Sequence, residues 1–218
     1  MSEFSTQVLP IVWLSLEVSG LALVLSSFVG VPLGAWIGLT PFPSRWLVLV
    51  ILNTLTGLPP VLVGLVVYLL LSRSGPLGGM GWLFTPHAMV VAQTILAMPL
   101  VAAFTAGSVM AVDPELPEQL AALGATRGQI IRATLDESRL GLLIAIAAGF
   151  GSIISEVGAV MMVGGNIEGH TRVLTTAILL ETRQGNFALA GVLGIVLLAV
   201  SLAINLLVLS MQRRTARR

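Results

Sequence analysis

Long apolar runs joined by short polar connections make up most of this chain of 218 residues. The hydrocarbon core of a bilayer is about 30 Å thick, so a helix needs about 20 predominantly apolar residues to cross it. Runs of that length predict five crossings: 14–38, 46–71, 88–112, 140–163 and 187–210. The pattern therefore predicts an all-α integral membrane protein, and five crossings leave room for only a single domain, residues 1–218.

Composition agrees with a membrane protein and excludes several kinds of chemistry. Hydrophobic residues make up 56% of the chain and charged residues 10%, and the mean hydropathy is +0.99. Cysteine is absent, which excludes disulfides and thiolate sites. All 11 basic residues are arginine, so a Walker A phosphate loop, which needs lysine, is excluded as well. We expect a chain that is not an enzyme by itself, holds no cofactor or metal, and has no nucleic-acid partner.

The distribution of arginine predicts the orientation in the membrane, because basic residues accumulate on cytoplasmic connections. With the N-terminus outside, three arginines lie outside: Arg73, Arg172 and Arg183. Eight then lie on the cytoplasmic side: Arg45, Arg127, Arg132, Arg139, Arg213, Arg214, Arg217 and Arg218. The C-terminus and residues 113–139 are thus predicted to be cytoplasmic. The terminal "RRTARR" is interpreted as a positive-inside anchor, with recognition of anionic membrane lipid as the alternative.

The polar segment 113–139 has the pattern of two short helices. Asp113 and Pro114 are suited to a helix start. The Asp side chain caps the first N–H groups, and the N–H that Pro lacks has no helical partner at the first position. Three leucines follow at spacings of four and three and form an apolar stripe: Leu116, Leu120 and Leu123. Gly124 is predicted to end this helix in a left-handed conformation.

A second helix is predicted directly after the glycine. Thr126 and Gln129 form a capping-box pattern, and apolar positions then lead toward the fourth crossing. A short exposed helix with an apolar stripe is typical of an element that binds in a groove on a partner protein. An ordinary interfacial hairpin fits the same pattern.

The polar segment resembles the cytoplasmic loop of permease subunits from binding-protein-dependent ABC importers. That family carries Glu-Ala-Ala, three residues and then Gly, and Glu118 and Gly124 keep the spacing. Gln119 and Leu120 replace the two alanines, while "LGA" at 123–125 matches the usual surroundings of the glycine. A later Leu-Pro of the family is replaced by Asp136-Glu137. The stretches "LDESRLGLL" at 135–143 and 164–190 are similar to tungstate permease subunits.

The resemblance covers most of the chain and implies a type I importer permease with five crossings. Such a subunit works as a homodimer with two ATPase subunits and an extracytoplasmic binding protein, and the implied cargo is tungstate. Molybdate or another oxyanion is the alternative within the class. The resemblance also implies that loop 113–139 docks the ATPase, through five residues: Glu118, Leu120, Leu123, Gly124 and Ala125. From other classes, a small secondary transporter or channel and a membrane scaffold stay open.

Several polar or helix-breaking residues inside the crossings are candidates for a translocation pathway. Pro59 and Pro60 remove two helical hydrogen bonds near Asn53 and Thr56, and freed carbonyls within a membrane need partners or a water-lined cavity. Pro99 lies at the middle of the third crossing. A break at the midplane is typical of a transport path. Simple kinking of the helices is the alternative interpretation.

The fourth crossing combines small residues with one acid. Small residues recur four apart, as in Ala145 and Gly149, Ala148 and Ser152, and Gly151 and Ser155, which favours close helix packing. Glu156 is predicted to follow on the same helix, where a carboxylate must be paired, hydrated or protonated. We favour a structural or gating role for Glu156, while the secondary-transporter hypothesis makes it an ion or proton site. Ser152, Ser155 and Glu156 complete the pathway candidates.

The segment 171–183 is helical in pattern but too short to cross, so it is predicted to lie against the outer surface. Asn166, Thr171 and Arg172 would gather at the outer mouth, where Arg172 would attract an anion and an exposed helix start would offer N–H groups. An interfacial helix anchored by arginine is the alternative. His87 and His170 have no second ligand at metal spacing and are interpreted as interfacial.

Overall fold

The computed structural model describes residues 2–215, and all regular secondary structure within that range is helical. The helices are α1 (Ser2–Leu39), α2 (Arg45–Thr56), α3 (Pro60–Leu71), the 3₁₀ turn η1 (Gly78–Met80), α4 (Pro86–Met110), α5 (Glu115–Ala122), α6 (Arg127–Glu137), α7 (Arg139–Ile154), α8 (Gly158–Gly164), α9 (Leu174–Arg183) and α10 (Phe187–Thr215). The all-α prediction is confirmed.

Three segments of the described chain are long and apolar enough to cross a membrane: Val8–Leu39, Pro86–Met110 and Phe187–Val208. Two bent pairs, α2 with α3 at 91° and α6 with α7 at 59°, bring the number to five if each pair forms one span. The fourth predicted crossing needs a correction, because its helix ends at Ile154 and a separate short helix, α8, follows after Val157. Glu156 therefore lies in a break and not on the helix that carries the small pairs.

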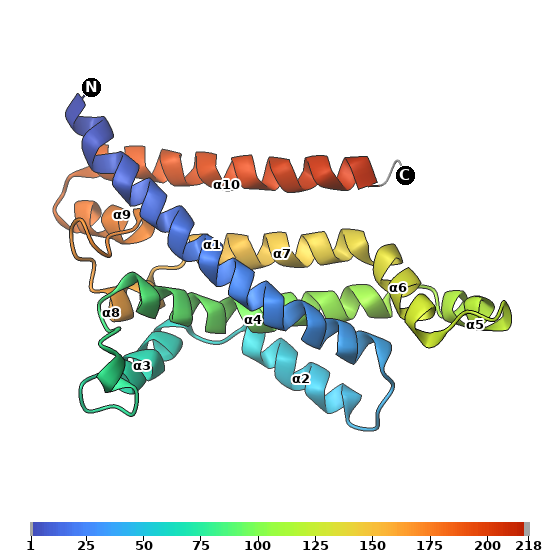
Figure 1. Cartoon of the computed structure of the whole chain (residues 1–218). Helices are drawn as coiled ribbons and strands as arrows, with labels where there is room; N and C mark the ends of the chain where they lie inside the picture. The colour runs from blue at the N-terminus through green and yellow to red at the C-terminus, as the bar shows by residue number, and fades with distance from the viewer. Residues whose placement is uncertain (1, 216–218) are drawn as a thin grey trace.

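Close contact between α1 and α4 forms the centre of the bundle, and α1 crosses obliquely over α4 and α7 (Figure 1). Gly30, Gly34 and Gly38 lie four residues apart on the α1 face that meets α4. A Cβ at Gly34 would collide with the Ala102 carbonyl and lie 2.7 Å from the Thr105 Cβ. The absence of side chains at these three positions lets the two backbones approach closely, as small residues do in membrane helices.

The remaining helices pack around this pair. Helix α2 lies against α4, α3 lies against α8, and α9 lies against α10. A buried apolar cluster joins α3, α4 and α8 through residues such as Val67, Met89 and Val160. Most of α10 and the outer faces of α2 and α3 are exposed, including Trp46 and Leu62.

The two ends of the bundle carry different elements (Figure 1). The start of α1 lies at one end together with α3, α8 and α9. Helices α5 and α6 project from the opposite end, where α10 also finishes. This arrangement separates the segment 113–139 from the predicted outer mouth by the length of the bundle.

Candidate functional site

The loop between α4 and α7 begins with the capping arrangement that the sequence predicts. The Asp113 Oδ1 accepts the backbone N–H of Glu115 at 2.9 Å. Pro114 directly precedes α5 and has helical angles, with φ −61° and ψ −21°, and its missing N–H leaves no helical bond unmade at this position. Glu115 and Glu118 lie in the first turn of α5. Their charges are favourable next to the positive end of the helix dipole.

Gly124 ends α5 in the left-handed conformation, with φ +83°. The Gly124 N–H donates to the Ala121 carbonyl and the Ala125 N–H donates to the Leu120 carbonyl, both at 3.0 Å. This pair of bonds is the Schellman arrangement, which satisfies the last carbonyls of a helix. The Gln129 Oε1 then accepts the Thr126 N–H at 2.7 Å, closing the predicted capping box at the start of α6. The helix, glycine, helix prediction is confirmed.

The apolar stripe of α5 is divided between two surroundings. Leu116 and Leu120 are half-buried, and Leu116 lines a cavity of about 590 Å³ beside the adjoining ends of α4 and α7. Leu123 is 83% exposed, and Glu118 is exposed as well. The chain itself therefore covers part of the stripe, because α5 folds back against α6. Leu123 is thus the exposed member of the stripe, Glu118 is an exposed charge on the same helix, and the role of both in docking stays a prediction.

The first break within the membrane lies at Gly57–Pro59, where α2 and α3 meet at 91°. Pro59 and Pro60 cannot donate to the carbonyls of Leu55 and Thr56, so the helical ladder stops there. The Leu58 N–H reaches back to the Leu55 carbonyl at 3.2 Å, which closes a tighter turn. The predicted break is confirmed.

The second break lies at Ser155–Val157, between α7 and α8, and is held by Glu156. Its Oε1 accepts the Ala159 N–H at 2.9 Å, while its carbonyl accepts the Thr175 hydroxyl at 2.9 Å. The carboxylate thus caps the first turn of α8, where N–H groups and the helix dipole favour a negative charge. This contact supplies the partner that an acid within the membrane needs.

The two breaks lie against each other. A Cβ at Gly158 would lie 2.9 Å from the Val61 Cγ2 and 3.4 Å from the Glu156 Oε1. A Cβ at Gly64 would lie 2.8 Å from the Ala159 Cα, which brings the backbones of α3 and α8 into contact. The start of α3 and the start of α8 therefore form one broken-helix region.

The pathway candidates differ in their exposure. Five of them are exposed on the surface of the single chain: Asn53, Pro59, Pro60, Ser152 and Ser155. Thr56 and Glu156 are partly exposed, whereas Pro99 is buried in α4 and lines no open surface of the chain. The small residues divide in the same way. Ala145 and Gly149 are buried, and a Cβ at Gly149 would meet Val101 of α4 and Leu23 of α1, whereas Gly151 has open space above its Cα. The packing prediction is thus confirmed for the first pair.

The outer-mouth prediction is wrong in one respect, because the start of α9 is buried and the N–H groups of Val173 and Leu174 are occupied. The Leu174 N–H donates to the Ser15 Oγ of α1 at 2.8 Å, and the Val173 N–H donates to the Thr176 Oγ1 at 3.1 Å. Arg172 is paired with Glu168 at 3.4 Å, and only 19% of its side chain is exposed. The Glu168 carboxylate therefore already pairs with Arg172, the residue that was predicted to attract an anion.

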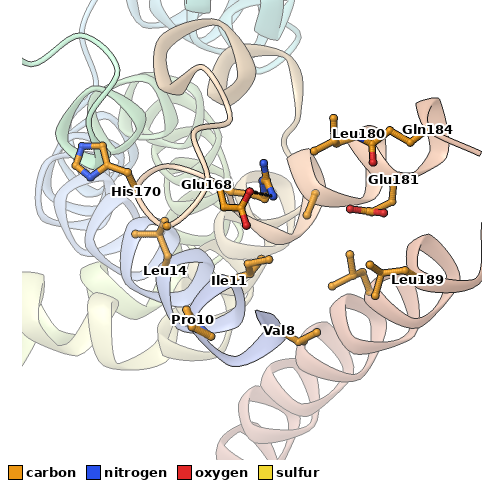
Figure 2. Close-up of a pocket in the computed structure, with 14 residues that line it drawn as sticks. Val8, Pro10, Ile11, Leu14, Glu168, His170, Leu180, Glu181, Gln184 and Leu189 are labelled. Atoms are coloured by element: carbon orange, nitrogen blue, oxygen red, sulfur yellow. Dashed lines mark ion pairs between the residues drawn. The ribbon is translucent and has the colours of Figure 1, made fainter. Parts of the chain in front are cut away.

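The other outer residues serve the turn before α9. The Thr171 Oγ1 donates to the Gly164 carbonyl at 2.6 Å and accepts the Ile167 N–H at 2.9 Å. Asn166 adopts the left-handed conformation at φ +52°. Nearby, a cavity of about 510 Å³ lies between α1, α9 and α10, and Glu181 of α9 and Leu189 of α10 are among the residues that line it (Figure 2). Glu168, His170 and Arg172 line the same cavity, and the dashed line in Figure 2 marks the ion pair between Glu168 and Arg172.

Comparison with known proteins decides the family. The model of the "Binding-protein-dependent transport system inner membrane component" family matches residues 30–218. The chain belongs to this family. It is therefore a multi-pass transport component of the cytoplasmic membrane, as the resemblance implied.

Individual relatives of this permease agree with the family. A "Tungstate uptake system permease protein TupB" from Peptoclostridium acidaminophilum is 42% identical over 210 residues, covering 96% of this chain and 92% of the relative. A "Probable anion ABC transporter permease protein" from Haloferax volcanii is 41% identical, covering 96% and 93%. The MetNI methionine ABC transporter in an inward-facing conformation has the same fold, with a TM-score of 0.79 at 19% identity over 99% of both chains.

Three polar contacts of the permease have no signal in the local sequence pattern. The Gln93 Nε2 of α4 donates to the Ile153 carbonyl at 3.0 Å, which satisfies the last turn of α7 next to the break. Ser15 of α1 caps α9, and Thr175 of α9 holds the Glu156 carbonyl. A buried polar group in an apolar helix is costly unless it is bonded, which explains why Gln93 and Ser15 need partners. Their partners were not predictable.

Proposed function

We propose that this permease is the transmembrane subunit of an ATP-driven importer of an oxyanion, and that the oxyanion is tungstate. The observation that carries the proposal is the 42% identity to a tungstate uptake permease over 96% of the chain. The anion permease at 41% identity supports the same chemical class of cargo. Molybdate is the alternative cargo, since it shares the tetrahedral shape and the double negative charge.

The work of import supports coupling to ATP. Moving one negative charge inward against an interior-negative potential costs about 2.3 kcal/mol per 100 mV, so a divalent oxyanion costs roughly twice that. A passive channel would release the anion outward at such a potential. The proposal therefore includes a separate ATPase subunit that binds ATP, because this chain has no lysine for a Walker A loop.

We place the ATPase contact on the α5 side of the loop 113–139. Leu123 is 83% exposed and lies next to Gly124, which fixes the direction in which the chain leaves α5. An apolar side chain held in a rigid capping geometry is suited to a groove on a partner. The extracytoplasmic binding protein would meet the opposite end of the bundle, around α8 and α9.

A homodimer completes the proposal and gives the exposed polar residues a role. Asn53, Ser152 and Ser155 are exposed on the single chain within its apolar segments. Polar groups at this depth are costly against lipid and instead face a protein partner or a water-filled cavity. A second copy facing α2, α3 and α7 would enclose these residues and the broken-helix region in a central path.

The test is uptake by vesicles that contain the permease, its ATPase and its binding protein. We expect tungstate uptake that requires ATP and all three components, and unlabelled molybdate added in equal amount competes more weakly than unlabelled tungstate. Vesicles without the ATPase serve as the matched control and should take up nothing above background.

Two results would contradict the proposal in different ways. If molybdate competes more strongly than tungstate, the cargo is molybdate, and the protein is still the permease of an ATP-driven importer. Uptake in the absence of the ATPase, driven by an imposed proton gradient, would place the protein among secondary transporters.

A further inference from the structure

A basic cavity of about 540 Å³ lies where the loop 113–139 meets the membrane bundle. Its walls come from the end of α1, the start of α2, the end of α4, the first part of α5, and α6. Arg45 and Arg127 line it, and none of the described residues that line it is acidic. Apolar side chains such as Met110 and Ile131 complete the wall, and both are substantially exposed. The cavity thus combines two positive charges with an apolar surface that is open to the outside.

Arg45 is held in place but is not fully satisfied. Its Nη2 donates to the Gly38 carbonyl at the end of α1 at 2.6 Å. Its Nε is buried and has no hydrogen-bond partner among the described residues. A guanidinium presents several N–H donors in a fixed plane that matches phosphate oxygens, so the Arg45 side chain is suited to bind an oxyanion in addition to the carbonyl that it already holds.

Aromatic residues place this cavity at the membrane surface. Trp36 and Phe42 stack with ring centroids 5.2 Å apart, and Trp46 follows Arg45 directly and is 75% exposed. Tryptophan is enriched at the boundary between hydrocarbon and headgroups, where its ring is apolar and its N–H is wet. On this basis we expect Arg45 to lie at the depth of lipid phosphate groups.

We propose that this cavity binds the phosphate group of an anionic phospholipid from the leaflet on the side of α5 and α6. The phosphate lies between Arg45 and Arg127, and the acyl chains run over Met110 and Ile131 toward the bilayer. Because Arg45 starts α2 and Arg127 starts α6, the lipid links the membrane bundle to the loop 113–139. The inference goes beyond the proposed function, because lipid binding is measurable without transport.

A second cavity at the same end of the bundle has a similar volume but the opposite charge, so the lipid proposal applies to only one of the two. It measures about 590 Å³ and is lined by Asp113, Glu115 and Glu137. Three carboxylates repel an anionic headgroup, so a similar volume at the same end is unsuited to the same lipid. The lipid is assigned to the cavity of Arg45 and Arg127 because of its positive charge and its expected depth in the membrane, and not because of its volume.

The experiment measures lipid retained by the purified permease complex after extraction from vesicles of phosphatidylglycerol and phosphatidylcholine in equal amounts. Native mass spectrometry counts each retained lipid for the wild type and for Arg127→Gln, Arg45→Gln and Arg132→Gln. Arg132 lies exposed on α6 but does not line the cavity, so its variant is the matched control.

We expect the wild type to retain phosphatidylglycerol over phosphatidylcholine. Each change in the cavity should lower this retention about fivefold, the factor that one basic residue contributes near an anionic surface. The control should retain wild-type amounts. Arg127→Gln is the deciding variant, since Arg127 is exposed and Arg45 also holds the end of α1. Equal retention in Arg127→Gln and the wild type, or equal retention of both lipids, would overturn the proposal.

A free anion in solution could bind the same two arginines as a lipid phosphate group. Inorganic phosphate added to the lipid-loaded complex distinguishes these two ligands. No release of phosphatidylglycerol at phosphate concentrations well above that of the lipid supports a lipid site. Full release by phosphate would instead assign the cavity to a free oxyanion and contradict the lipid. Neither result affects the assignment of the transported cargo.

Discussion

Glu156 shows how the fold accommodates a carboxylate inside an apolar region. Its side chain caps α8 through the Ala159 N–H at 2.9 Å, and its backbone carbonyl accepts the Thr175 hydroxyl. Gln93 adds a bond from α4 to the neighbouring Ile153 carbonyl at 3.0 Å. Hydrogen bonds thus join α4, α7, α8 and α9 around one break, and a structural role for Glu156 stays our prediction.

We predict that Glu156→Gln retains ATP-dependent uptake at least in part, with an unchanged dependence on external pH. The amide oxygen still accepts the Ala159 N–H, and only the attraction of a charge to the helix dipole is lost, about 0.3–1 kcal/mol. Glu156→Ala, which leaves that N–H without its acceptor, should lower the thermal stability by more. Uptake in reconstituted vesicles across a range of external pH is the measurement. Proton-driven uptake in the wild type that disappears in Glu156→Gln would show a proton site instead.

At the scale of elements, local signals predicted the helix ends and the breaks. Gly124, the capping box of Thr126 and the double proline at 59–60 act within a few residues of themselves, so the sequence pattern contains their effect. The bond from Leu174 to Ser15 joins residues 159 positions apart, and no local pattern carries that information. The α9 start was predicted to be exposed for this reason. The break at Glu156 was missed because small and apolar residues continue through it.

We predict that Gly124→Val weakens association with the ATPase and leaves membrane insertion unchanged. A β-branched residue at φ +83° costs about 1–3 kcal/mol, so the chain would leave α5 in another direction and move Leu123. Gly128→Val is the matched control, because Gly128 lies in α6 with ordinary backbone angles and open space around it. Co-purification of the ATPase with each variant is the measurement. Equal association of both variants would mean that the turn at Gly124 does not position a docking surface.

A second element-scale prediction concerns the contact between α1 and α4. Gly34→Leu should destabilise the permease by about 1–3 kcal/mol or more, because overpacking forces backbones apart and a Cβ there already collides with the Ala102 carbonyl. Gly20→Leu on the same helix should have little effect, since no atom lies within 4 Å of its added Cβ. Thermal unfolding of the purified proteins in detergent compares them. Similar melting temperatures for the two variants would contradict the close packing described for α1 and α4.

At the scale of the whole molecule, charge and shape assign different tasks to the two ends of the bundle. Arg45, Arg127, Arg132 and Arg139 belong to the segments at the end that carries α5 and α6. The opposite end has fewer arginines, and Arg172 there is paired with Glu168. The end with α5 and α6 is thus suited to the cytoplasm, where positive residues accumulate and an ATPase is available.

The orientation gives the last prediction. Fusions of a reporter at residues 44, 126 and 215 should all report the cytoplasm, because these positions belong to the end with α5, α6 and the finish of α10. Fusions at 75 and 185 should report the outside, since both lie in connections at the opposite end (Figure 1). Paired reporters that are active on only one side of the membrane make each position its own control. The bend of 91° between α2 and α3 makes position 75 the strictest test, because a pair that turned back without crossing would leave 75 on the same side as 44. A cytoplasmic signal at 75 would therefore reduce the number of crossings, and an outside signal at 126 would exclude ATPase docking by the loop 113–139.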